Sequence, residues 1–222
     1  MIGEAVLPVD RQPEVAMPRR IQRRVSRLLL LILAGSLTVN LVGLDWGLPY
    51  MWHTDEKTGN AVEMNTRRSL DPQYFINPHL HLYAIAGIVR VAYAIFPGHM
   101  QFHHAAMLPM TNPDHPDRPL QFWAMRLSRG FSALAAVVGV FVIYRIGRKH
   151  FGEAEGLLAA AFLAVTMGYV ELAHYATPES LLFVLVLLVL ASFDAVLVSG
   201  RRRDYLVAGA LIGLALSTKY TV

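Results

Sequence analysis

Apolar residues gather in long runs along the chain and do not alternate with polar residues. Five runs approach the roughly 20 residues that a helix needs to cross the hydrocarbon layer of a membrane. They cover residues 28–48, 122–144, 156–175, 180–198 and 205–222. The pattern predicts an all-α membrane protein with about five transmembrane helices.

A sixth apolar run, residues 79–96, is interrupted by Arg90 and followed by Pro97 and Gly98. Its position conflicts with the positive-inside rule, which places clusters of Lys and Arg on the cytoplasmic side. Three such clusters lie within residues 11–27, 145–149 and 201–203, and must share that side. The three clusters lie on the same side only if residues 79–96 do not cross the membrane. We therefore predict an interfacial or re-entrant helix there.

The spans then alternate in direction, and residues 49–121 form one long first extracytoplasmic loop that contains juxtamembrane helices. Residues 1–27 are predicted to be a basic cytoplasmic tail, disordered over residues 1–18. The chain ends inside the last apolar run without a basic flank, as a truncated chain would. We expect residues 28–222 to be the N-terminal portion of a longer transmembrane domain.

Composition supports an integral membrane protein. Hydrophobic residues make up 55% of the 222 and charged residues 16%, against about a quarter in soluble chains. The absence of Cys excludes a disulfide scaffold, a thiolate zinc site and a cysteine nucleophile. The net charge of +4 lies in short clusters beside apolar runs, which favours membrane orientation and not nucleic-acid binding.

Candidate chemistry lies at the predicted outer ends of three spans. Asp55 and Glu56 follow the first span, Glu179 precedes the fourth and Lys219 ends the fifth. Each residue has a simpler explanation: Asp55, with Thr54, could cap a helix that begins near Lys57, Glu179 could be a first-turn carboxylate, and Lys219 could extend toward the headgroups. Their convergence on one side of the membrane favours a site. His99, His103 and His104 have a spacing that could bind zinc, but the prolines that follow favour a polar loop.

Several ordered strings resemble the GT-C integral-membrane glycosyltransferases, most closely the group of protein O-mannosyltransferases and lipid A aminoarabinose transferases. The strings are residues 47–56, 78–83, 126–129, 144–148, 174–179 and 209–220. They extend over nearly the whole chain, in the order and topology of that family.

The resemblance implies transfer of a sugar from a polyprenyl-phosphate donor to a protein or glycolipid acceptor, with inversion, outside a bacterial inner membrane. It places the catalytic base at Asp55, with Glu56 as its partner, and the donor-phosphate lysine at Lys219. Glu179 falls on the acid that opens a later span. A divalent cation held by Asp55 and Glu179 is a further expectation.

The remaining substrate-binding candidates are residues beside these groups at the same depth: His53, Lys57, His174 and Tyr175. The chemistry needs a base for the acceptor hydroxyl and positive charge at the leaving phosphate, which Lys219 or a cation supplies. The main alternative is a secondary transporter or channel subunit, with charges near the bilayer midplane. A non-catalytic membrane scaffold is the third possible function.

Overall fold

The computed structural model describes residues 19–48, 53–96 and 118–220, and every regular element in these ranges is a helix. The predicted tail at 1–18 and the histidines at 99–104 lie outside the described residues. The helices are α1 (Arg19–Leu41), α2 (Thr58–Arg67), α3 (Leu80–Ile95), α4 (Arg118–His150), α5 (Glu153–Val165), α6 (Met167–Ala173), α7 (Glu179–Ser199) and α8 (Arg202–Leu216). The prediction of an all-α protein is confirmed.

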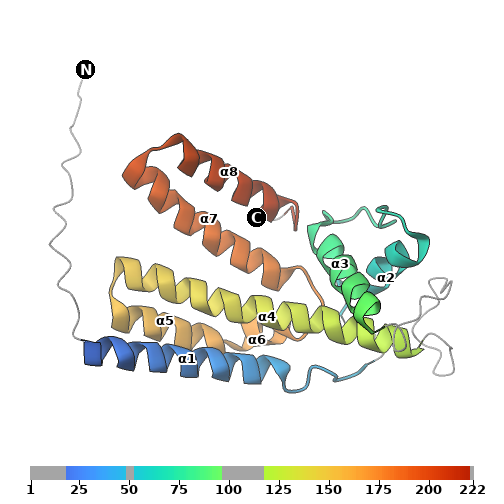
Figure 1. The fold of residues 1–222 in the computed structure, drawn as a ribbon, viewed down its shortest axis with the longest axis horizontal. Helices are drawn as coiled ribbons and strands as arrows, with labels where there is room; N and C mark the ends of the chain where they lie inside the picture. Colours follow the sequence, from blue (N-terminus) through green and yellow to red (C-terminus); the bar gives the residue numbers. More distant parts are fainter. Residues whose placement is uncertain (1–18, 49–52, 97–117, 221–222) are drawn as a thin grey trace.

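Helix α4 is the centre of the bundle. It contacts α1, α5, α6 and α7, and its first turns contact α2 and α3 (Figure 1). Its 33 residues span about 50 Å at 1.5 Å per residue, more than the hydrocarbon layer of about 30 Å. The long helix therefore joins the membrane bundle to the two helices of the first loop.

Three helices are long and apolar enough to cross a membrane, or four if the bent pair α5 and α6 forms one span. Thr166 separates the two members of that pair, whose axes differ by 61°. The fifth predicted span corresponds to α8, whose 15 residues extend about 22 Å and fall short of the hydrocarbon thickness. Helix α3, with 16 residues, is also shorter than a span.

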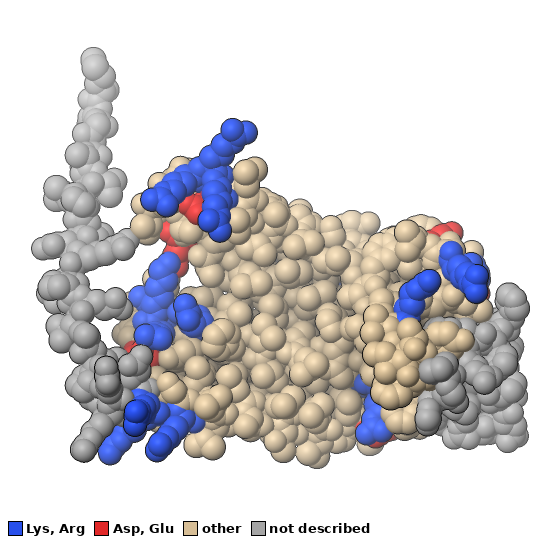
Figure 2. All heavy atoms as spheres, in the orientation of Figure 1, with Lys and Arg blue, Asp and Glu red and all other residues tan. Residues whose placement is uncertain are grey.

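Successive long helices run in opposite directions, as the charge pattern predicts (Figure 1). The start of α1, the α4–α5 turn and the α7–α8 turn lie together at one end of the bundle, so the three basic clusters share a side. Figure 2 shows Lys and Arg gathered there, and on the face in view a wide uncharged band separates them from the other end. We call the end with the start of α1, the α4–α5 turn and the α7–α8 turn the basic end. We call the opposite end, where α4 and α7 begin and α8 ends, the site end.

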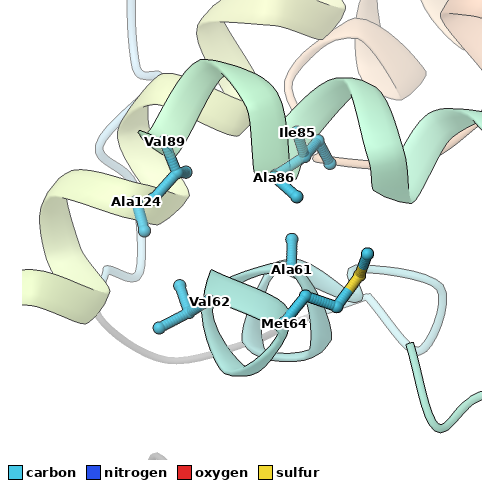
Figure 3. Close-up of a cluster of buried hydrophobic side chains, with 7 residues drawn as sticks. All are labelled: Ala61, Val62, Met64, Ile85, Ala86, Val89 and Ala124. Carbon is cyan, nitrogen blue, oxygen red and sulfur yellow. The ribbon is translucent and has the colours of Figure 1, made fainter. Parts of the chain in front are cut away.

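A small core holds the helices of the first loop against α4. Seven buried apolar residues form it: Ala61, Val62 and Met64 of α2, Ile85, Ala86 and Val89 of α3, and Ala124 of α4 (Figure 3). Asn65 links the same helices, because its amide donates to the Ala86 carbonyl oxygen at 2.9 Å. The first loop is thereby fixed at the site end.

Candidate active site

Three chain segments bring Asp55, Glu179 and Lys219 together at the site end. Asp55 precedes α2, Glu179 is the first residue of α7, and Lys219 follows the last turn of α8. The Lys219 ammonium lies 2.5 Å from Glu179 Oε1 and 3.8 Å from Asp55 Oδ2. The three side chains are between 21% and 33% exposed, so the cluster is shielded but reachable from solvent.

Backbone contacts fix where Lys219 lies. The Lys219 N–H donates to the Ala215 carbonyl, and the Leu80 N–H at the start of α3 donates to the Ser217 carbonyl at 3.0 Å. The turn after α8 is therefore tied to the first loop. The hydrogen bond to Glu179 raises the pKa of Lys219 above its usual value, so the lysine is an ammonium at neutral pH.

Glu56, the neighbour of Asp55, lies in a different environment. Its carboxylate is fully buried and receives two hydrogen bonds from Arg129, at 2.8 Å from Nε and 3.2 Å from Nη2. The Ala176 N–H donates to the same carboxylate at 3.0 Å. Arg129 also donates to the carbonyls of Leu44 and Trp46. This ion pair joins the end of α1, the start of α2, α4 and the α6–α7 turn.

The alternative role of Asp55 as a helix cap is wrong. Helix α2 begins at Thr58, its N-cap residue is Lys57, and no side chain caps it. Asp55 is instead held by a hydrogen bond from its own N–H to His53 Nδ1 at 3.1 Å. Its carboxylate is left to face Lys219.

The other predicted site residues differ in what they contact. His53 accepts the hydrogen bond from the Asp55 N–H, whereas Lys57 and His174 contact groups outside the cluster. The Tyr175 ring lies 5.1 Å from the His53 ring and 5.8 Å from the Arg129 guanidinium. His174 contacts the carbonyl oxygens of Val170 and Val42, so it ties α6 to the end of α1. The Lys57 ammonium lies over the Tyr74 ring at 5.1 Å.

A cavity of about 420 Å³ opens beside this region. Its walls include His174, Tyr175, Glu171 and Arg129, together with residues that follow α1. Its volume lies within the usual range for small-molecule pockets. Asp55, Glu179 and Lys219 are not among its lining residues.

Arg129 and His81 are site residues that sequence reasoning did not single out. Arg129 has a visible signal, because a charge inside an apolar run needs a buried partner. His81, in the first turn of α3, is buried against Phe131, and its Nε2 has no hydrogen-bond partner. Burial lowers its pKa from 6.5 to about 4, although Glu179 acts in the opposite direction. No pattern in the sequence indicates this burial.

The divalent cation predicted between Asp55 and Glu179 stays a prediction. In the described ranges no group of three or more His, Asp or Glu side chains could hold one. The predicted ligands, Asp55 and Glu179, share the ammonium of Lys219, which already supplies positive charge between them.

Comparison with known proteins identifies a family for the second half of the chain. Residues 114–222 match the model of the dolichyl-phosphate-mannose-protein mannosyltransferase family. The chain has no significant match among curated proteins or solved structures. The matched part contains α4 to α8, and with them Arg129, Glu179 and Lys219. Residues 114–222 are therefore similar to this family, and the match supports a GT-C-like, mannosyltransferase-type membrane glycosyltransferase.

Proposed function

We propose that the site end transfers a sugar from a polyprenyl-phosphate donor to the hydroxyl group of an extracytoplasmic protein or glycolipid. The carrying observation is the convergence of Asp55 and Glu179 on the Lys219 ammonium, at the end opposite the basic clusters. The family match supports glycosyl transfer in a membrane. The basic clusters support an extracytoplasmic location for the site end. The bacterial inner membrane is part of the proposal and follows from the family resemblance.

The proposed reaction is one inverting displacement with Asp55 as the base. Asp55 takes the proton of the acceptor hydroxyl as its oxygen forms a bond to the anomeric carbon. The bond between that carbon and the phosphate oxygen breaks, and polyprenyl phosphate leaves as a stable anion. Lys219 has three N–H donors and stabilises this anion. Glu179 holds Lys219 in place and contacts the sugar.

The depth of the cluster suits a lipid-linked donor. The polyprenyl chain stays in the leaflet, so its phosphate lies at the headgroup level, where the outer helix ends are found. Lys219 lies just beyond α8, and α3 begins beside it. This position of the three residues supports a donor whose phosphate lies at the headgroup level.

We assign Glu56 a positioning role in this reaction. Both oxygens of its carboxylate accept hydrogen bonds from within the protein, one from Arg129 and the Ala176 N–H and the other from Arg129, so neither is directed at a substrate. It fixes the backbone from which Asp55 extends. Tyr175 packs against the Arg129 guanidinium and His53 packs against Tyr175, so both rings support the same positioning role.

A secondary transporter is the competing function with one observation in its favour. The bend of 61° between α5 and α6 resembles the broken helices of transporters. In transporters the broken helix carries the substrate site near the midplane. Here the charged cluster is contributed by the ends of α7 and α8 and by the loop after α1, not by the break.

The test is sugar transfer in membranes that express the whole gene, with polyprenyl-phosphate mannose as the probe. Asp55→Asn should reduce transfer by at least 100-fold, because it removes the basic oxygen with little change in volume. Lys219→Gln should also reduce transfer strongly, and the product should have the opposite anomeric configuration to the donor.

Asp71→Asn is the matched control. Asp71 is an exposed carboxylate in the same loop, and its contact is to the Gln73 N–H and not to the cluster. It should keep wild-type transfer. Full activity in Asp55→Asn would refute the base, and movement of label across the membrane without a glycosylated product would favour the transporter.

A further inference from the structure

A second cavity lies at the opposite end of the bundle, between α4 and α7, with a volume of about 720 Å³. One part of its wall is basic and consists of Arg145, Arg148 and Lys149 of α4. Another part is apolar and includes Phe141 of α4 with Leu188 and Ala191 of α7. The proposed reaction at the site end uses none of these residues.

The polarity of this cavity changes along the membrane normal. Helices α4 and α7 both run toward the basic end, so higher residue numbers on either helix lie nearer that end (Figure 1). Phe141 therefore lies on the side of the uncharged band, and Lys149 lies at the end, about 12 Å further along α4. The apolar wall faces the depth of acyl chains and the basic wall faces the depth of headgroups.

One cation of the wall is available to a ligand. Arg148 pairs with Glu153, and Lys149 pairs with Asp194, which His150 also contacts. Asp194 lines the cavity too, but these two partners hold its carboxylate. Arg145 is exposed and has no ion pair in the described part of the chain.

The surroundings add to the positive potential. Residues 23–27, 145–155 and 194–204 hold nine Lys and Arg against four Asp and Glu. Basic pockets between transmembrane helices, bordered by apolar surface, suit the phosphate of an anionic lipid. A zwitterionic lipid would bring its own cation into the same positive field.

We propose that the groove between α4 and α7 binds an anionic phospholipid. The phosphate contacts Arg145 at the basic end, and an acyl chain follows Phe141, Leu188 and Ala191 toward the bilayer centre. The bound lipid fills the space between two helices that otherwise contact each other nearer the site end. This site is independent of the proposed glycosyl transfer.

The test is native mass spectrometry of the full chain in detergent, titrated with phosphatidylglycerol. Phosphatidylcholine with the same acyl chains and inorganic phosphate are the comparison ligands. We expect the wild type to retain phosphatidylglycerol in preference to both. Arg145→Gln should weaken retention about five-fold, as expected for one cation near a lipid phosphate.

Arg203→Gln is the matched control, because it removes the same charge from the same end at an exposed position of α8 outside the groove. It should retain the lipid as the wild type does. Ala191→Leu keeps every charge and narrows the apolar wall, so it should weaken phosphatidylglycerol binding as well.

Equal losses in Arg145→Gln and Arg203→Gln would overturn the site in favour of diffuse attraction. Equal retention of phosphatidylcholine would overturn the anionic preference. Displacement of the lipid by stoichiometric inorganic phosphate would assign the groove to a free anion.

Discussion

Two adjacent carboxylates, Asp55 and Glu56, acquire different chemistry from their surroundings. Glu56 is fully buried and receives hydrogen bonds from Arg129 and the Ala176 N–H. Asp55 is partly exposed and faces the shared cation Lys219. A carboxylate with all its contacts inside the protein serves the fold, whereas one at the edge of a cluster can reach a substrate. The surroundings in the fold give the two residues different roles, which their adjacent positions in the sequence do not indicate.

The buried ion pair predicts a large effect of removing one partner. Glu56→Gln leaves the Arg129 charge buried without its carboxylate, which costs about 3–5 kcal/mol of stability. We expect a clear fall in the thermal unfolding temperature of the purified protein. The double variant Glu56→Leu with Arg129→Met removes both charges and should be no less stable than the single variant.

Glu63→Gln provides the comparison for this experiment. Glu63 is partly buried and pairs one turn along α2 with Arg67, whose side chain is 37% exposed and can turn to solvent. Such a pair within one helix contributes about 0.5 kcal/mol or less. Its unfolding temperature should stay near that of the wild type. A Glu56→Gln variant as stable as Glu63→Gln would contradict the structural role of the ion pair.

His81 predicts acid sensitivity. Burial lowers the pKa of His81 to about 4 in the folded protein, against 6.5 in an unfolded chain. Between these pH values the unfolded chain binds a proton that the folded protein does not, so stability is complete above about pH 6.5 and falls as the pH drops toward 4. The full effect is on the order of 3 kcal/mol.

The measurement is the unfolding temperature of wild type and His81→Phe between pH 7 and pH 4. The phenyl ring keeps the packing against Phe131 and cannot titrate, so the variant should lose less stability in acid than the wild type. His79→Phe, at the partly exposed position before α3, should keep the wild-type slope because His81 is intact. If the unfolding temperature fell equally with pH in all three proteins, His81 would be excluded as the source of the acid sensitivity.

At the scale of elements, glycines decide how closely α4 and α5 approach. A Cβ atom added to Gly156 would lie 2.7 Å from the backbone nitrogen of Arg148 and 2.8 Å from the Tyr144 carbonyl oxygen. Gly147, on the facing side of α4, would meet Gly156 Cα at 2.9 Å. Small residues at such contacts let helix backbones pack closely in membranes.

Gly156→Ala should therefore destabilise the protein by about 1–3 kcal/mol, because backbone atoms cannot move aside as a flexible side chain can. Gly209→Ala is the matched control in α8, where an added Cβ meets no atom within 4 Å. That variant should unfold at or above the wild-type temperature. The comparison is made by thermal unfolding in the same detergent, and equal unfolding temperatures would contradict close packing at Gly156.

The hydrophobic runs predicted which segments are helical more reliably than where the helices end. The run at 180–198 became α7 (Glu179–Ser199), because Pro178 precedes it and Gly200, at φ 58°, ends it. The run at 28–48 was predicted too long: α1 ends at Leu41, and Gly43 adopts φ 81° two residues later. The run at 156–175 is broken at Thr166, which no residue pattern indicates.

Side-chain environments follow from packing between distant segments. The partner of Glu56 was therefore also not predictable from the sequence.

At the scale of the whole molecule, the basic clusters and the candidate site lie at opposite ends. The basic end gathers three Arg-rich clusters (Figure 2) beside a groove suited to an anionic lipid. The site end brings Asp55 and Glu179 to the Lys219 ammonium. The first loop joins the site end because α2 and α3 pack on the outer turns of α4. A protein oriented by its arginines would thus present the cluster to the extracytoplasmic side.

This arrangement predicts the accessibility of single cysteines introduced into the Cys-free chain. Positions 79 and 96 flank α3, which packs with α2 at the site end. We expect both positions to lie on the extracytoplasmic side, because α3 does not cross the membrane. A membrane-impermeant maleimide applied to intact spheroplasts should label both His79→Cys and Phe96→Cys. Phe151→Cys, in the α4–α5 turn, and Ser199→Cys, at the end of α7, should react only after permeabilisation, because both lie at the basic end. Labelling of position 96 only from the cytoplasm would mean that α3 crosses, and would place the arginines after α4 on the wrong side of the membrane.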